Sequence, residues 1–324
     1  MKKVLHIVEP IINTYTSYGA LFSIIPQSAM PWVLNNFIQL NYVYNWNIAT
    51  FDSHRMLICN CPAIDFYDVP KEILFSNRNF KDIIIEAIDR GDYLFFYVDW
   101  YYLSLTEMYK KGHLAHEIFV YGYDTEENLF YVADNFINGK FSFEKCDFNE
   151  LAQSYLYNNS DYSFVKSIRF LRVHENEGCN LNINQIIFGL KSYLNSSEIF
   201  NLDGQLQMLY GMSIIDFYLK KISSLNEEII DIRFFHLFYE HKLLMEMRVN
   251  YLQEKRVIID NDKLGELANE LKRDALILRN MVIKYNITKK RKNAIQVYEE
   301  LIRIKEKDYT FCLQLLEELK SINY

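Results

Sequence analysis

A histidine and an aspartate delimit a stretch of the sequence that could carry out acid–base chemistry. In HEIFVYGYDTEENLFYVAD, residues 116 to 134, two runs of aromatic and branched residues flank the polar segment DTEEN. This pattern predicts a β-hairpin whose turn lies at residues 124–128. Antiparallel partners are placed symmetrically about a turn, and the midpoint of positions 116 and 134 is 125. We therefore expect His116 and Asp134 to be direct or diagonal cross-strand neighbours.

Such a pair has a defined chemical use. A carboxylate that binds an imidazole fixes the tautomer of the ring and stabilises its cation, as a general base requires when it activates a nucleophile. His116 and Asp134 would then be two of the three members of a catalytic triad. The alternative is structural: Asp134 begins the turn DNFINGK and His116 ends a strand, both partly exposed. The spacing is compatible with either interpretation.

The elements that must position this pair belong to a β-rich region. Short aromatic and branched runs predict strands at 93–99, 117–124, 128–134 and 163–173. Helical patterns precede them at residues 18–25, at 30–44 with Pro31 in the first turn, and at 80–91, where Gly91 suits a C-cap. Helices followed by a sheet indicate an α+β domain with an antiparallel sheet.

The pattern becomes helical after about residue 175. The polar stretch VHENEGCNLNIN separates a predicted domain at 1–175 from a second at 180–324. Residues 229–252 carry an apolar stripe at spacings of three and four, which predicts a helix of roughly 25 residues. Residues 264–287 and 292–319 have the same period. We expect residues 185–324 to form an α-helical bundle of four or five helices.

Composition excludes several classes of protein. The formal charge of −7 argues against a general nucleic-acid surface, since phosphate affinity comes mainly from Lys and Arg. The basic run Lys289–Lys292 is interpreted as a solvated helix face that could also dock an acidic partner. Five cysteines form no even disulfide framework, and no apolar run is long enough for a membrane span. We expect a cytoplasmic protein with reduced thiols.

Other polar residues are candidate components of the site. Asp99, Trp100 and Tyr102 follow the strand at 93–99 and could line the same cleft or pack in an interface. His113 lies close to His116, but no third metal ligand has convincing spacing, so no metal and no cofactor are predicted. Arg233, His236, Glu240 and His241 cluster on the long helix, where salt bridges and helix docking explain them.

The segment from His116 to Asp134 resembles papain-like domains of the bacteriocin-processing peptidase group, and most closely the N-terminal domains of the butirosin biosynthesis protein H family. In that group a His opens a strand that reaches a Gly-Tyr-Asp turn, here Gly122 to Asp124, and an Asp ends the next strand. The resemblance spans residues 8–172 and is best at 93–135. It implies a papain-like fold, a base at His116 and an orienting carboxylate at Asp134.

The sequence departs from the family at the nucleophile. The family's cysteine begins the first long helix, but PIINTYTSYGALFSII contains none. Thr14 aligns with that position, beside Asn13, and Thr16 and Ser17 are close alternatives. An internal threonine lacks the free α-amino base of terminal-threonine enzymes, so the simplest interpretation is a degenerate site. Cys59 and Cys61 lie outside the expected helix start.

The resemblance implies two functions of different class. One is acyl transfer or thioester or amide hydrolysis in carrier-protein-dependent biosynthesis of a nonribosomal peptide, polyketide or aminoglycoside-type product. In that case His116, Asp134 and Thr14 would be catalytic, and Asn13, Ser17, Asp99, Trp100 and Tyr102 would contact substrate. The other is an inactive pseudoenzyme that binds an acyl or peptidyl carrier protein or another partner. The sequence leaves a homo-oligomer open.

Overall fold

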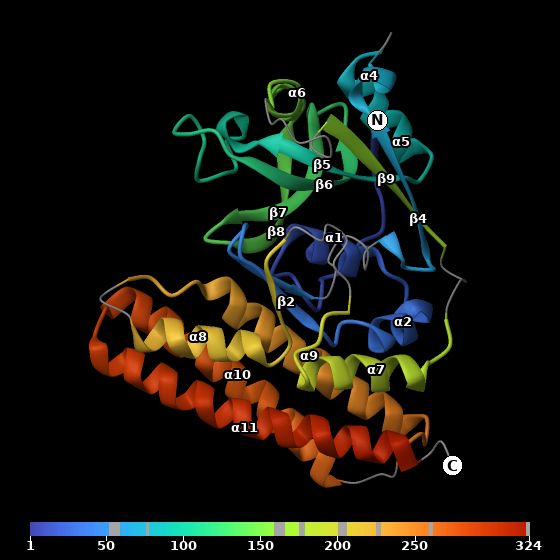
Figure 1. Cartoon of the computed structure of the whole chain (residues 1–324). Helices are drawn as coiled ribbons and strands as arrows, with labels where there is room; N and C mark the ends of the chain where they lie inside the picture. The colour runs from blue at the N-terminus through green and yellow to red at the C-terminus, as the bar shows by residue number, and fades with distance from the viewer. Residues whose placement is uncertain are drawn as a thin grey trace. The chain divides into compact units, whose positions relative to one another are not determined.

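The chain forms two compact units in the computed structural model (Figure 1). The structure describes residues 1–51, 59–75, 78–158, 166–174, 179–199, 206–224, 228–258 and 262–321. Unit 1 comprises Met1–Ala29 and Ile58–Gly178, and unit 2 comprises Met30–Leu57 and Cys179–Tyr324. The sequence-based division placed residues 30–57 in the first domain, whereas Met30–Leu57 groups with unit 2.

Unit 1 is built on an antiparallel sheet of seven strands among the described residues, in the order β4-β9-β5-β6-β7-β8, with β1 paired to the end of β6. The strands are β1 (Lys2–Val4), β4 (Ile64–Pro70), β5 (Tyr93–Asp99), β6 (Ala115–Asp124), β7 (Leu129–Ile137), β8 (Lys140–Asp147) and β9 (Ser167–Val173). Its helical segments are α1 (Thr16–Ile24), η1 (Gln27–Ala29), α4 (Lys71–Leu74), α5 (Phe80–Asp89), η2 (Trp100–Tyr102) and α6 (Phe148–Leu156).

The main core of unit 1 lies between the sheet and helices α5 and α6. Alternate residues of β5, Leu94, Phe96 and Val98, are buried there with Phe80 of α5 and Leu151 of α6. The remaining residues of each strand point to the opposite face because side chains alternate along a strand. The expected helix at 80–91 is confirmed: Asn79 caps its start, and Gly91 follows its end with a φ of 87°.

Helix α1 is held close to strand β8 by a glycine. A Cβ atom at Gly19 would overlap ring carbons of Phe141. Alanine normally favours a helix over glycine by about 1 kcal/mol. At this position Gly19→Ala is instead expected to lower the free energy of unfolding by about 1–3 kcal/mol because the ring must move. Urea unfolding followed by tryptophan fluorescence measures the change, and Phe141→Leu should partly relieve it. A Gly19→Ala variant as stable as the wild type would contradict this packing.

Unit 2 is mainly helical, as expected from the period of the sequence after residue 180. Its helices are α2 (Met30–Asn35), α7 (Ile183–Leu194), α8 (Ser213–Ser223), α9 (Ile232–Glu254), α10 (Asp262–Thr288) and α11 (Arg291–Ser321). A small antiparallel sheet in the order β10-β2-β3 accompanies them, formed by β2 (Leu40–Val43), β3 (Ile48–Phe51) and β10 (Met208–Tyr210). The α+β class with a helical C-terminal region is confirmed.

The expected helix at 30–44 is wrong over most of its length. Helix α2 ends at Asn35, Phe37 has a φ of 52°, and residues 40–43 form strand β2. Tyr42 and Val43 suit a strand, and pairing on both sides with β3 and β10 completes their backbone hydrogen bonds. Strand β10, which pairs with β2, lies over 160 residues away in the sequence, so the pattern within residues 30–44 could not reveal this pairing.

Candidate functional site

His116 and Asp134 meet at the end of the β6–β7 hairpin. Phe119 pairs with Ala133 across the hairpin, so the regular register would place His116 opposite Phe136, since both pairs of numbers sum to 252. Asp134 is therefore the diagonal neighbour of His116, one of the two arrangements that the sequence predicts. His116 Nδ1 lies 3.1 Å from Asp134 Oδ2. The register of β7 with β8 shifts between Asp134 and Ile137, a kind of irregularity that often re-aims side chains near sites.

The Asp134 carboxylate is fully buried and accepts four hydrogen bonds. Oδ1 accepts from the Thr16 hydroxyl at 2.5 Å and from the backbone N–H of Asn135 at 2.6 Å. Oδ2 accepts from Trp100 Nε1 at 3.0 Å and from His116 Nδ1. Both carboxylate oxygens therefore act as acceptors, each for two donors. Asp134 is thus held by α1, η2 and β6 together.

The His116 ring is oriented so that one nitrogen remains for chemistry. Among the described residues, the ring hydrogen-bonds through Nδ1, which faces Asp134 Oδ2 and, at 3.2 Å, the carbonyl of Glu117. Two acceptors on one side place the proton on Nδ1 and leave the Nε2 lone pair as the basic site. The indole of Trp100 lies 4.2 Å from the ring, centroid to centroid. The His116 side chain is 32% exposed.

The surroundings also set the proton affinity of His116. Burial lowers the pKa of His116, but the charge and hydrogen bond of Asp134 raise it, and the net pKa lies above the ordinary value. The folded ring therefore keeps its proton to a higher pH than the unfolded one. Its contribution to stability is complete below pH about 6.5 and disappears as the pH rises through the folded pKa.

This shift can be measured by NMR titration of the His116 ring. We expect a pKa above the ordinary histidine value in the wild type and a lower pKa in Asp134→Asn, because the neutral amide no longer stabilises the cation. His113→Ala, which removes a neighbouring ring, is the control and should leave the His116 titration in place. An unchanged His116 pKa in Asp134→Asn would show that Asp134 does not govern the ring.

Glu117 connects the next position of β6 to the start of α1. Its carboxyl accepts from the Tyr97 hydroxyl at 2.9 Å and from the backbone N–H of Ser17 in the first turn of α1. Burial raises the pKa of Glu117, and the nearby His116 and these hydrogen bonds oppose that rise. Tyr15, at the N-cap, makes no side-chain cap, so Glu117 supplies the acceptor that this helix start requires.

The predicted nucleophile region lies beside the pair. Thr14, Thr16 and Ser17 are all buried. The Thr16 hydroxyl donates to Asp134 and approaches Asn135 Oδ1 at 3.0 Å, so it supports the carboxylate and is not directed at the base. The carbonyl of Asn13 accepts from Asn135 Nδ2 at 3.1 Å, which fixes the backbone next to Thr14. The roles assigned to Thr14, Asn13 and Ser17 stay predictions.

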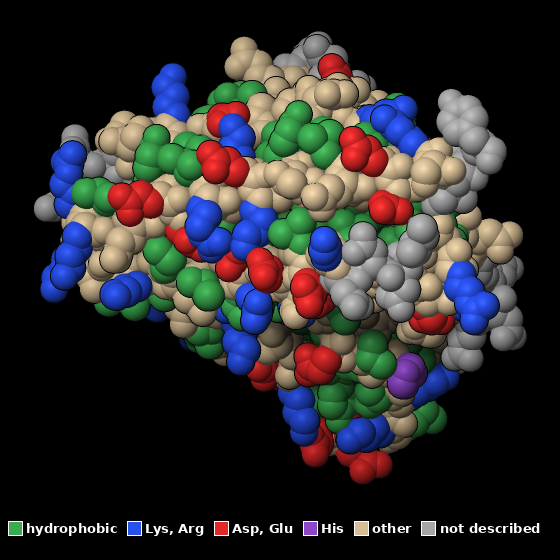
Figure 2. Space-filling view, turned by 90° about the horizontal axis from the view of Figure 1, so that it is seen from below, with side chains coloured by type: hydrophobic (Ala, Val, Ile, Leu, Met, Phe, Trp, Pro, Cys, Tyr) green, Lys and Arg blue, Asp and Glu red, His purple; other side chains and the backbone are tan. Residues whose placement is uncertain are grey.

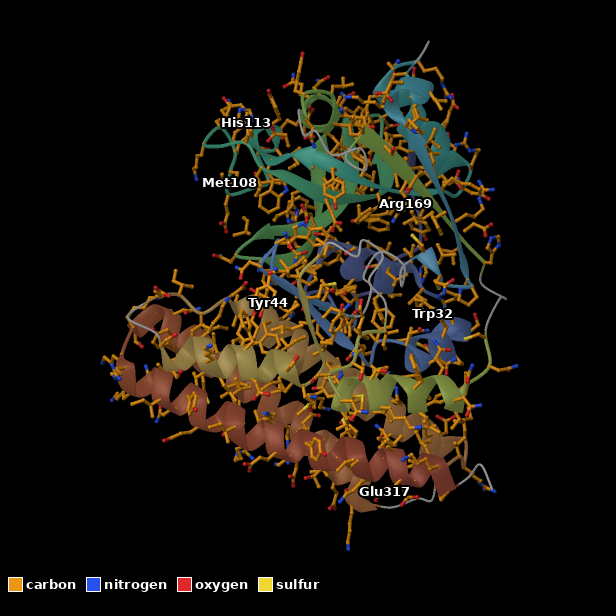
Figure 3. All side chains as sticks on the ribbon, in the orientation of Figure 1. Trp32, Tyr44, Met108, His113, Arg169 and Glu317 are labelled. Carbon is orange, nitrogen blue, oxygen red and sulfur yellow. The ribbon has the colours of Figure 1, made fainter. Side chains whose placement is uncertain are left out.

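Asp99 and Tyr102 lie in the connection from β5 to β6. Asp99 accepts from the backbone N–H groups of Tyr101 and Leu114 and binds His113 Nδ1 at 2.6 Å. These contacts hold the connection that carries the label His113 in Figure 3. Tyr102 lies among rings, 5.0 Å from Tyr101 and 5.6 Å from Tyr157 between centroids. Substrate binding by Asp99 and Tyr102 stays a prediction, and Trp100 alone of this group contacts the His116–Asp134 pair.

The polar cluster of the long helix divides between surface and interior. His236 lies 3.3 Å from Glu240, and Arg233 pairs with Asp231. His241 is buried, and burial lowers its pKa well below the ordinary value; Nε2 contacts the carbonyl of Ile38 at 2.8 Å. These contacts agree with the structural interpretation. In the described ranges, no group of three or more His, Cys, Asp or Glu side chains is arranged to hold a metal ion.

Some components of the site were not predicted. The sequence suggests Thr16 as a possible nucleophile and not as a donor to Asp134, and it does not single out Asn135, Glu117 or Tyr97. Of these residues, only Glu117 could have been predicted from the sequence. A carboxylate next to a candidate base histidine is a possible hydrogen-bond acceptor for the backbone N–H groups at the start of a helix. Of the two cysteines outside the expected helix start, Cys59 interacts electrostatically with Arg169, and Cys61 is buried.

The comparisons with known proteins leave the family unassigned. The chain matches no protein-family model, and no curated protein matches it. Among the described residues, no helix is both long enough and apolar enough to cross a bilayer. The geometry of the site therefore carries the functional argument.

Proposed function

We propose that this protein catalyses acyl transfer or hydrolysis at a thioester or amide, with His116 as the general base and Asp134 as its orienting carboxylate. The observation that carries the proposal is the arrangement of one buried, four-times bonded carboxylate on His116 Nδ1, with Nε2 of a partly exposed ring left as the base. A carboxylate with a purely structural role would not need a histidine partner whose side chain is partly exposed.

The proposed reaction proceeds by proton transfer through Nε2. As a hydroxyl, amine or water attacks the acyl carbon, its proton moves to Nε2 and its oxygen or nitrogen bonds to that carbon. The C–S or C–N bond to the leaving group then breaks, and the imidazolium returns the proton to the leaving sulfur or nitrogen. Asp134 stabilises the cation between these steps. Because the base must be neutral, the rate should rise with pH through the raised pKa of His116.

The resemblance supplies the context of this chemistry. We propose a papain-like arrangement for unit 1, an acyl or peptidyl carrier protein as donor in a natural-product pathway, and a cytoplasmic location. Thr14 is the proposed internal nucleophile. Its hydroxyl would form an ester with the acyl group, which an amine or water then takes up in a second, equivalent step.

The test uses a short-chain acyl thioester of N-acetylcysteamine and an acylated carrier protein, each with and without a primary amine. Product formation is followed by chromatography, and intact-protein mass spectrometry detects an acyl adduct. His116→Ala should lower the rate by about 10²–10⁴-fold, the usual worth of a general base. The control is His174→Ala, which breaks a His–Asp pair with a more exposed carboxylate, 2.8 Å between His174 Nε2 and Asp65 Oδ2, elsewhere on the sheet.

Each outcome has a defined meaning. Turnover that is lost in His116→Ala but kept in His174→Ala supports the enzyme, and an adduct lost in Thr14→Ala locates the nucleophile. Turnover of both substrates that is equal in wild type and His116→Ala would reject the proposal.

A second candidate function is supported by the bond from Thr16 to Asp134. This hydroxyl and the absence of a cysteine at the start of α1 are the features expected of a pseudoenzyme that uses the site for binding. Carrier binding without turnover, unchanged in His116→Ala, would favour that function.

A further inference from the structure

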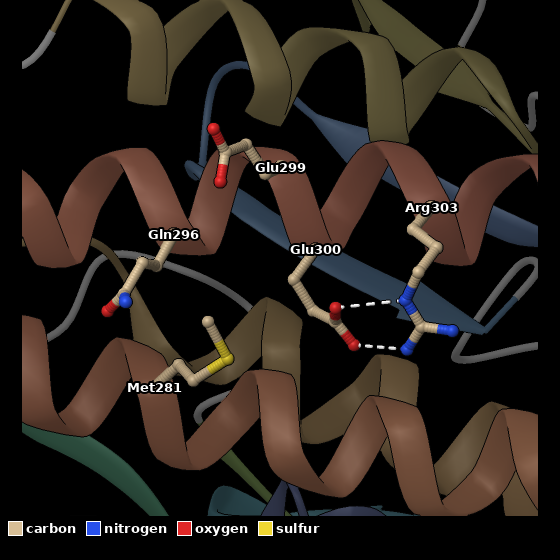
Figure 4. Close-up of a pocket in the computed structure, with 5 residues that line it drawn as sticks. All are labelled: Met281, Gln296, Glu299, Glu300 and Arg303. Carbon is tan, nitrogen blue, oxygen red and sulfur yellow. Dashed lines mark hydrogen bonds and ion pairs between the residues drawn. The ribbon is translucent and has the colours of Figure 1, made fainter.

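Carboxylates on the face formed by α10 and α11 take part in local ion pairs. Figure 2 shows Lys and Arg side chains interspersed with Asp and Glu over this face. In the groove drawn in Figure 4, Glu300 binds Arg303, 3.0 Å from Oε2 to Nε, and Arg303 also pairs with Asp274. Exposed ion pairs of this kind are common on protein surfaces and contribute little to stability. The carboxylate of Glu117 in unit 1 has different partners.

Helix α1 has no acceptor of its own at its N-terminus. The N-cap residue Tyr15 makes no side-chain cap, and the first turn contains no acidic residue. All nine residues of the helix, Thr16–Ile24, are buried. The backbone N–H groups of a first helical turn have no partners within the helix, and a buried donor without an acceptor is costly. An acceptor must therefore come from another element.

Glu117 supplies that acceptor from the strand that carries His116. Its carboxyl group accepts from the backbone N–H of Ser17. It also accepts, at 2.9 Å, from the hydroxyl of Tyr97, which lies directly opposite on β5. A carboxylate is favoured at this position because the N-terminus of a helix carries a partial positive charge. Strand β6 and the start of α1 are thus bound to each other one residue away from the base.

Two carboxylates therefore connect the first turn of α1 to the base. Thr16 donates to Asp134, and Asp134 binds Nδ1 of His116. Glu117 holds the same turn through the next amide, that of Ser17, and its charge also acts on the His116 ring. Loss of Glu117 would change both the position of this turn and the charge that faces the base.

The titratable groups near Glu117 among the described residues come from four strands. They are Tyr97 of β5, His116 of β6, Asp134 of β7 and Arg169 of β9. Helix α1 contributes a backbone N–H group and has no charged residue. Burial and the like charge of Asp134 raise the pKa of Glu117, while His116 and Tyr97 oppose that rise. Glu117 and His116 therefore influence each other's charge.

We propose that Glu117 is a positioning residue of the candidate site. Its carboxylate fixes the first turn of α1, beside the candidate nucleophile Thr14, against the strand of the base, and its charge adds to that of Asp134 on His116. This inference rests on the acyl chemistry proposed above. The two effects can be separated, because Glu117→Gln keeps an acceptor oxygen and removes the charge, whereas Glu117→Ala removes both.

The experiment compares the wild type with Glu117→Gln and Glu117→Ala. Amide hydrogen exchange at Ser17 measures how firmly the start of α1 is held, and NMR titration of the His116 ring measures the effect of the charge. Hydrolysis of S-acetyl-N-acetylcysteamine over a range of pH measures the proposed reaction. The control is Glu150→Ala, which removes a carboxylate that accepts from the backbone N–H of Ser104 at 3.0 Å. It should speed exchange at Ser104 and leave exchange at Ser17 and the His116 titration unchanged.

In Glu117→Ala we expect exchange at Ser17 to be at least about tenfold faster, because the amide has lost its acceptor. The maximal rate of hydrolysis should fall about tenfold or more, since a displaced helix start misplaces the groups beside the base. Glu117→Gln should keep both quantities near their wild-type values. In both variants the pKa of His116 should fall, because a negative charge near the cation is lost, and the pH profile should move to lower pH with it.

Ser17 exchange and a His116 titration that are the same in the wild type and both Glu117 variants would overturn the inference. Turnover that is lost in His116→Ala but keeps its maximal rate and pH profile in both Glu117 variants would also overturn it, and would leave the proposed function intact. If the wild type hydrolyses no thioester while Ser17 and His116 respond as expected, the proposed function fails and the placement of α1 by Glu117 stands.

Discussion

Replacement of Asp134 by alanine is expected to lower the free energy of unfolding by about 3–5 kcal/mol, because it leaves several buried donors without their acceptor. Thr16, Trp100, His116 and the backbone of Asn135 all donate to this carboxylate. Asp134→Asn should lower the free energy of unfolding less, since the amide oxygen still accepts hydrogen bonds. It should still be destabilising, because the new NH₂ group faces a donor that the second carboxylate oxygen had accepted from. Both variants should lose the proposed activity because the His116 ring loses its orientation.

Urea unfolding followed by tryptophan fluorescence measures this loss. Asp65→Ala is the control: its carboxylate also binds a histidine, His174, but both side chains are substantially exposed, so the expected change is about 0–1 kcal/mol. A loss in Asp134→Ala no larger than that of Asp65→Ala would show that the network around Asp134 contributes little to stability.

A comparably large loss of stability is expected when a buried ion pair in the interior of unit 2 is broken. Lys242 and Asp308 are fully buried with 2.5 Å between Nζ and Oδ2, and the Tyr193 hydroxyl donates to the same carboxylate oxygen at 2.7 Å. Burial, and then the charge of Asp308, raise the pKa of Tyr193 well above its ordinary value, so the phenol stays a donor. Asp308→Ala leaves the ammonium buried without its counter-charge and should cost about 3–5 kcal/mol.

Removal of both charges should lower the free energy of unfolding less than removal of either charge alone. The double variant Lys242→Met with Asp308→Leu replaces the ion pair by apolar side chains, which is often close to neutral. Thermal and urea unfolding of the wild type, both single variants and the double variant form a cycle that isolates the interaction. The exposed pair Lys255–Glu254 provides the comparison, and its coupling is expected to be much weaker than that of the buried pair. Additive losses at Lys242 and Asp308 would contradict a coupled buried pair.

The sequence predicted local elements well and long-range partners poorly. Strands β5, β6 and β7 and the helices α5, α9, α10 and α11 follow from patterns within one element or one hairpin. Strand β2 was assigned to a helix because its apolar run is as compatible with a helix, and its partner β10 lies far along the chain. No local pattern encodes such a pairing.

In the candidate site too, contacts within one hairpin could be predicted and contacts between distant elements could not. The proximity of His116 and Asp134 could be calculated from hairpin symmetry alone. The bonds from Thr16 and Trp100 to Asp134 connect α1 and η2 to β7, and they depend on how those elements pack. The contact of Glu117 with the start of α1 depends on packing in the same way. Tertiary packing therefore decides which hydroxyl supports the carboxylate.

The assignment of Met30–Leu57 to unit 2 has a consequence for synthesis on the ribosome. The chain leaves unit 1 after Ala29 and returns to it at Ile58. Strand β2 pairs with β10, which emerges about 150 residues after β3, roughly 8–30 s later at ordinary elongation rates. During that interval the apolar β2–β3 hairpin lacks its partner strand β10. Chaperones that bind exposed hydrophobic segments of nascent chains should therefore affect the yield of this protein. For the same reason, an expression clone that stops at residue 178 would retain residues 30–57 without the rest of unit 2, on which they pack. Expression of a soluble unit 1 therefore requires excision of residues 30–57.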